Sequence, residues 1–144
     1  VLTTVLLIFA GGLCSYKLMS DRSLPKDLAG DYVSVVPNYV ERQLILNTNN
    51  IKRAYFAHEE VKKIYLNKDF TQKFIFYNSK GDSTISKSTW KVKNDSLILH
   101  FPERDFNICL TRLQFTNKLY SINNLIPCGD SVAVKNVSVF KKVK

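Results

Sequence analysis

Two histidines and three cysteines are the residues of this sequence with the clearest potential for chemistry. His58-Glu59-Glu60 begins like the helix of a zinc protease, but Lys62 stands where that motif needs its second histidine. His100 lies in an alternating apolar pattern, which predicts that it points outward or into a polar end of the fold. No serine lies in a nucleophile elbow and no glycine-rich loop precedes a helix. We therefore predict that the protein is not an enzyme, with no catalytic residue, no metal site and no cofactor.

The cysteines are Cys14, Cys109 and Cys128. Cys14 follows an uncharged apolar run, residues 1–13, which makes about 20 Å of helix against a hydrocarbon core of roughly 30 Å. That length favours a secretory signal, and an uncleaved anchor that extends to Met19 is the alternative. In an oxidising envelope, Cys109 and Cys128 would form a disulfide worth about 3 kcal/mol. Two unpaired cysteines are the alternative.

Apolar and polar residues alternate across residues 61–101, and polar turn residues separate the short apolar runs. A period of two is what a strand shows when one face is buried. Four strands joined by three short turns pair as neighbours, so this region predicts an antiparallel meander. Similar patterns at residues 27–36, 106–110, 119–122 and 132–139 bring the expected total to eight to ten strands.

Residues 43–56 and 63–76 look like copies of one another at an offset of 20 residues, each reading as strand, polar turn, strand. The comparison predicts a strand at residues 44–47 and favours a strand over a helix for residues 51–57. A short helix across residues 51–63, with Asn50 as its cap, is the alternative.

Length and composition fit one folded domain. The 144 residues include nine Phe, seven Tyr and one Trp, and the formal net charge is +9 from 21 basic and 12 acidic residues. Such a charge permits a nucleic acid, an anionic membrane or an acidic glycan as partner. The basic residues are scattered, without an RNA-binding aromatic signature or zinc-finger spacing, so we predict no nucleic-acid partner. We expect a signal peptide or lipoprotein leader over residues 1–14, a polar tether over residues 15–26 and a monomeric domain over residues 27–144.

The stretch Phe9-Ala10-Gly11-Gly12-Leu13-Cys14 resembles the lipobox of bacterial lipoproteins. The resemblance implies that Cys14 is acylated and that the protein is attached to a membrane through an N-terminal lipid anchor. Cleavage after Gly12 by an ordinary signal peptidase is the alternative.

Three further motifs together resemble the small lipocalin-like lipoproteins of bacterial envelopes: Leu28-x-Gly30-x-Tyr32, Ser88-Thr89-Trp90-Lys91-Val92 and Asp95-Ser96-Leu97-Ile98-Leu99. The resemblance implies a mainly β fold, a single antiparallel up-and-down β-barrel of about eight strands. The interior of such a barrel holds one small ligand or is filled by side chains alone. The resemblance also implies an exported protein of the bacterial cell envelope, at the outer membrane or in the periplasm.

Large aromatic residues at strand period are candidates to line a ligand cavity, and they fit a plain core as well: Tyr32, Phe74, Phe76, Trp90 and Phe101. The function we expect is an envelope-tethered binding module for a small apolar or amphipathic ligand. One alternative is a structural or interaction lipoprotein without a small ligand, which uses a basic face on an acidic surface or a protein partner. A secreted enzyme inhibitor is the other.

Overall fold

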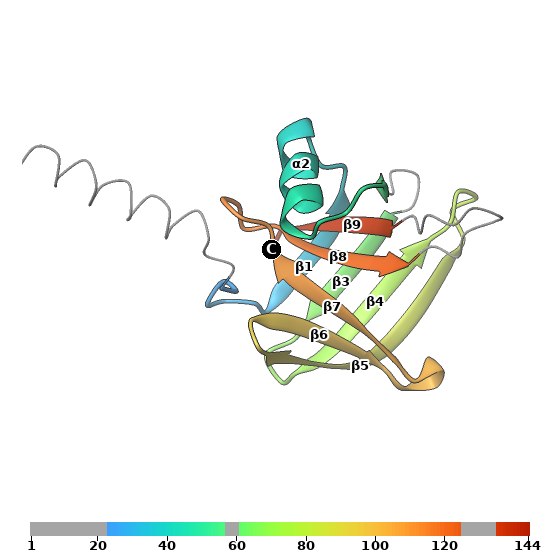
Figure 1. Cartoon of the computed structure of the whole chain (residues 1–144). Coiled ribbons are helices and arrows are strands. Elements are labelled where there is room, and N and C mark those ends of the chain that lie inside the picture. Colours follow the sequence, from blue (N-terminus) through green and yellow to red (C-terminus); the bar gives the residue numbers. More distant parts are fainter. Residues whose placement is uncertain (1–22, 57–60, 125–134) are drawn as a thin grey trace, which may run out of the picture.

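A computed structural model describes residues 23–56, 61–124 and 135–144 of the chain. Cys14, His58, Cys128 and the apolar leader lie outside the described residues. Within them the chain forms a closed β-barrel with one α-helix against its outer surface (Figure 1). In this part of the chain, no helix is both long enough and apolar enough to cross a membrane.

The strands are, in chain order, β1 (Gly30–Val35), β2 (Ala54–Phe56), β3 (Val61–Leu66), β4 (Thr71–Tyr77), β5 (Ser83–Lys93), β6 (Ser96–Phe101), β7 (Phe106–Arg112), β8 (Leu119–Asn124) and β9 (Lys135–Lys142). The helix is α2 (Tyr39–Thr48), and a 3-10 turn, η1 (Pro102–Arg104), joins β6 to β7.

Eight of these strands close the barrel. Their order is β1-β3-β4-β5-β6-β7-β8-β9, each neighbouring pair is antiparallel, and pairing of β9 with β1 completes the circuit. The eight-stranded up-and-down barrel expected from the sequence is therefore confirmed. β2 lies outside this circuit and pairs in parallel with the first residues of β9, along the edge that β1 leaves uncovered there.

Antiparallel pairing sends the connections alternately to two ends of the barrel. The turns β3–β4, β5–β6 and β7–β8 lie at the end where the chain enters β1 and leaves β9, and we term this the closed end (Figure 1, left). The β4–β5 turn and η1 lie at the opposite end, which we term the mouth (Figure 1, right).

Apolar side chains fill the barrel toward its closed end. The cluster consists of Leu28, Tyr32, Ile64, Leu66, Trp90, Leu97, Leu99, Phe101, Leu110, Leu119 and Phe140. Burying each side chain of this size stabilises the fold by about 1.5–3 kcal/mol. Gly30 allows the start of β1 to approach Lys144 closely, since it has φ +145° and a Cβ on it would collide with the Lys144 carbonyl oxygen. The Leu28-x-Gly30-x-Tyr32 motif thus has a packing role.

α2 stands where a strand was predicted for residues 44–47, so that prediction is wrong. Asn38 Oδ1 accepts a hydrogen bond from the Glu41 backbone (2.9 Å), and Glu41 Oε1 accepts one from the Asn38 backbone (3.3 Å), which together form a capping box. Ile45 is fully buried in a cluster with Leu113, Tyr120, Val137 and Val139, on the outer face of β8 and β9 (Figure 1). The burial of Ile45 and the capping box therefore stabilise a helix in this segment rather than a strand.

The neighbouring segment is resolved in favour of a strand. β2 (Ala54–Phe56) confirms part of the strand predicted over residues 51–57. The alternative helix across residues 51–63 is wrong, because β2 and the beginning of β3 lie within that range.

Candidate ligand-binding site

A cavity of about 340 Å³ lies at the mouth of the barrel. Its walls come from β4 to β7 and η1, and the lining residues are Phe74, Phe76, Thr84, Ile85, Ser86, Phe101, Glu103, Phe106 and Ile108. A volume of this size is at the lower end of the range of about 300–1,000 Å³ that is typical of small-molecule sites.

The register of the sheet explains why these side chains meet. Phe74 is paired with Ser86 and Phe101 with Phe106, and residues paired across antiparallel strands share one face. The Phe74 and Phe101 rings pack edge to face at 5.6 Å, and those of Phe101 and Phe106 stack at 5.0 Å. Phe106 remains 41% exposed, so this aromatic wall reaches from the buried interior to solvent. The cavity is thus preformed and accessible.

Polar side chains face the interior on the other strands. Lys62 Nζ donates to Ser138 Oγ at 3.0 Å and lies 5.8 Å from the ring centroid of Phe76, which is a cavity residue. The Lys62 backbone donates to Ser34 Oγ at 2.9 Å, and Ser121 is paired with Ser138 and buried beside it. The interior near the mouth therefore has an aromatic side and a hydrophilic side.

Two buried amides lack hydrogen-bond partners among the described residues. Gln72, which is 2% exposed, lies on the same face of β4 as Phe74, and neither its Oε1 nor its Nε2 has a hydrogen-bond partner among the described residues. Asn136 Oδ1 is likewise buried without a partner in that part of the chain. An unpaired buried amide costs about 1–3 kcal/mol. Gln72 does not line the cavity, because it lies near the start of β4, opposite Leu66 of the closed end.

The structure divides the five predicted cavity residues into two groups. Phe74, Phe76 and Phe101 are among the residues that line the cavity. Tyr32 and Trp90 lie outside it, in the part of the apolar cluster at the closed end, whereas Phe101 belongs to both the cluster and the cavity wall. Alternation predicts that all five face inward, but it does not predict which end of a barrel is filled.

Hydrogen bonds hold both closed-end aromatics in place. The Tyr32 hydroxyl donates to the Leu28 carbonyl at 2.7 Å, and Trp90 Nε1 donates to the Asn67 carbonyl at 2.9 Å. Burial, together with the nearby charge of Asp27, raises the pKa of Tyr32 to about 12. Tyr32 therefore serves as a neutral hydrogen-bonded core residue at neutral pH.

Sequence reasoning missed six residues of the cavity: Thr84, Ile85, Ser86, Glu103, Phe106 and Ile108. Phe106 and Ile108 had a usable signal, since both follow the alternation of a predicted strand. Thr84 and Ser86 had none, because small polar residues in a strand give no sign of what they face.

The remaining candidate residues lie away from the cavity. Cys109 is exposed on the outer face of β7, while Cys128 and Cys14 lie outside the described residues, so the disulfide and the lipidation stay predictions. The ring of His100 shares a hydrogen bond with Asn107 (Nδ1–Oδ1 2.7 Å) on the outside of the barrel. In the described part of the chain, no group of three or more His, Cys, Asp or Glu is arranged to hold a metal ion.

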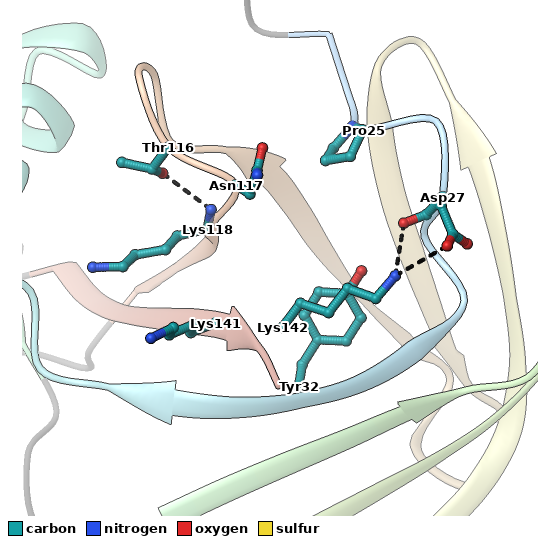
Figure 2. A pocket seen from close by; sticks show the side chains of 8 residues that line it. All are labelled: Pro25, Asp27, Tyr32, Thr116, Asn117, Lys118, Lys141 and Lys142. Carbon is teal, nitrogen blue, oxygen red and sulfur yellow. Dashed lines mark hydrogen bonds and ion pairs between the residues drawn. The ribbon is translucent and has the colours of Figure 1, made fainter. Parts of the chain in front are cut away.

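A second hollow, of about 510 Å³, lies at the surface of the closed end. Its lining residues are Pro25, Asp27, Tyr32, Thr116, Asn117, Lys118, Lys141 and Lys142 (Figure 2). The Lys142 ammonium points to Asp27 (Nζ–Oδ2 3.6 Å), and that of Lys118 is bound by both carboxylate oxygens of Glu41 on α2 (2.9 and 3.0 Å). Two of the three lysines are thus neutralised by carboxylates, which disfavours this hollow as an anion site.

No family model matches this sequence. No curated protein and no solved structure is significantly similar to it either. The chemistry of the site therefore rests on its own geometry.

Proposed function

We propose that this chain is an envelope-tethered, lipocalin-like binding module that holds a small apolar or amphipathic ligand at the mouth of its barrel. The observation that carries the proposal is the unequal filling of the interior: an apolar core at the closed end and an aromatic cavity at the mouth. The apolar leader that ends at Cys14 and the resemblance to lipocalin-like lipoproteins support the tether.

The polar interior favours an amphipathic ligand over a purely apolar one. Phe76 and Phe106 offer ring faces to an apolar body, whereas the Lys62 ammonium and the Ser138 hydroxyl place polar atoms beside Phe76. The apolar body would supply most of the affinity and the polar group the orientation.

A cavity-filling substitution tests this proposal. Ser86→Leu places a larger side chain in the cavity opposite Phe74, so it should raise the dissociation constant of the uncharged fluorophore N-phenyl-1-naphthylamine at least about tenfold, or about 1.4 kcal/mol. Thr89→Leu is the matched control, since Thr89 is exposed on the outward face of the same strand. Fluorescence titration of the three proteins measures the effect.

We expect the wild-type protein and Thr89→Leu to bind the fluorophore equally. Binding by all three proteins with the same affinity would place the fluorophore elsewhere and refute a ligand site at the mouth. Absence of binding by the wild-type protein, both to this probe and to an amphipathic analogue, would refute the binding function itself.

A further inference from the structure

Four apolar side chains project from the closed end of the barrel, and we refer to them as the closed-end rim. They are Phe70, which is 57% exposed, Val92 (50%), Phe115 (59%) and Val143 (60%). Each comes from a different place where strands end there, namely the β3–β4 turn, the last residues of β5, the β7–β8 turn and the residue after β9. Because these places follow one another around the barrel, the rim spreads over a surface rather than along a line.

Ordered turns present the two aromatic residues of the rim. Phe70 donates through its backbone to Asn67 (3.1 Å), accepts from the Trp90 backbone (2.9 Å), and its ring lies 4.9 Å from that of Trp90. Phe115 lies in a turn closed by the bond from the Leu113 backbone to the Lys118 carbonyl (2.8 Å). Since these backbones are already fixed, a contact made by either ring costs little further conformational entropy.

Lysines lie beside the rim in excess over acidic residues. Exposed basic residues there are Lys26, Lys68, Lys93, Lys141 and Lys144, and exposed acidic residues are Asp27, Asp69 and Asp95. Asp27 is already paired with Lys142. An apolar surface bordered by positive charge is complementary to the interface of a bilayer that contains anionic lipid.

The point at which the described chain begins also lies at the closed end. The described chain begins at Ser23, whose carbonyl accepts a hydrogen bond from Arg112 Nη1 (3.3 Å) at the end of β7, beside the rim. The sequence that precedes it contains no charged residue before Lys17. A leader held in a bilayer would therefore hold the closed end, and not the mouth, close to the lipid surface.

We propose that the closed-end rim rests on the surface of an anionic bilayer, with the rings of Phe70 and Phe115 at the level of the lipid headgroups and the lysines against the phosphates. The barrel then stands on the membrane with its mouth turned away from it. This goes beyond the ligand cavity and shares only the membrane tether with the proposed function.

Trp90 offers a direct probe, because it is the single tryptophan of the chain and lies under Phe70. The full chain is reconstituted with vesicles of phosphatidylglycerol and phosphatidylcholine, with or without bromine atoms near the headgroup end of the acyl chains. We expect brominated vesicles to quench Trp90 fluorescence in the wild-type protein. Phe70→Ser/Phe115→Ser should lower the quenching about twofold or more, since it removes the apolar part of the contact.

Ile85→Ser/Phe106→Ser is the matched control, because it removes two exposed apolar residues from the mouth instead. It should leave the quenching at the wild-type level. The ratio between brominated and plain vesicles corrects for any direct effect of Phe70 on Trp90 emission, and Phe115→Ser alone, which leaves the Phe70–Trp90 contact intact, should also lower the quenching.

Sedimentation with the vesicles separates the tether from the rim. A chain that sediments while Trp90 remains unquenched, or equal quenching in all variants, overturns the rim proposal and leaves the tether. A chain that does not sediment overturns both, without bearing on ligand binding at the mouth. A rim that covers a second copy of the chain would leave Trp90 unquenched and make a dimer that Phe70→Ser/Phe115→Ser dissociates, which also overturns the proposal.

Discussion

Gln72 is an unusual residue for the interior of an apolar barrel. Its amide is buried between β3 and β5, beside Leu66 and Ser88, and has no hydrogen-bond partner among the described residues. Burial of an amide is normally accompanied by hydrogen bonds, because the loss of water is otherwise uncompensated. Gln72 therefore lowers the stability of the folded protein.

Replacing this amide should stabilise the empty protein. We expect Gln72→Leu to raise the free energy of unfolding by about 1–2 kcal/mol, since it removes a buried donor and acceptor and retains most of the volume. Urea denaturation measures the change, with Gln114→Leu, at a half-buried turn position, as the control. A clear loss of stability in Gln72→Leu would mean that Gln72 is hydrogen-bonded in the folded protein.

Tyr32 gives a prediction about pH. Its pKa is about 12 in the folded protein and close to 10 in the unfolded chain, so the folded-state value is the higher one. The stability contributed by the neutral phenol is therefore complete below about pH 10 and is lost as the pH rises toward 12. We expect Tyr32→Phe to lose less stability over this interval than the wild-type protein.

Tyr39→Phe is the control for that experiment, because the Tyr39 ring is 75% exposed on α2. It should keep the wild-type dependence of the denaturation midpoint on pH. Identical curves for Tyr32→Phe and the wild-type protein would show that Tyr32 does not limit stability at alkaline pH.

At the scale of elements, strand alternation predicted the sheet better than it predicted α2. The runs around Ile64, Phe74, Trp90 and Leu99 alternate with period two, and they became β3 to β6. The run Leu44-Ile45-Leu46 resembles Ile64-Tyr65-Leu66 in composition but folds as a helix. A short apolar run does not distinguish the two structures by itself.

A usable signal for α2 stood upstream of that run. Asn38 followed by Glu41 three residues later is a capping-box pattern, and it precedes Leu44 and Ile45. The strand pattern predicted over residues 27–36 ends just before Pro37-Asn38, and the same pair also marks the start of a helix. The cavity was harder to predict, since facing inward and being surrounded by other side chains are separate properties.

The capping box leads to a prediction for α2. Asn38→Ala removes the side-chain acceptor of the Glu41 backbone and should lower the free energy of unfolding by about 1 kcal/mol. Thermal or urea denaturation measures it, and Asn47→Ala, an exposed position in the same helix, should cause no loss. Equal losses in both variants would mean that the cap does not hold the helix start.

At the scale of the whole molecule, closure of the sheet separates two environments. Pairing of β9 with β1 completes the ring of eight strands, so neither β1 nor β9 is an open edge strand where the two pair. The apolar cluster closes one end of the barrel. The other end keeps an aromatic cavity, with the polar groups of Lys62 and Ser138 beside Phe76. One barrel can therefore present its closed end to a surface and its mouth to a ligand.

The position of a bound ligand tests this division most directly. In a complex of the protein with N-phenyl-1-naphthylamine, intermolecular nuclear Overhauser effects report which protons lie beside the ligand. We predict contacts from the ligand to Phe76, Phe106 and Ile108 at the mouth, and none to Leu97 or Leu110 in the apolar core. Contacts to Leu97 and Leu110, or only to residues on the outer face of the barrel, would contradict the account.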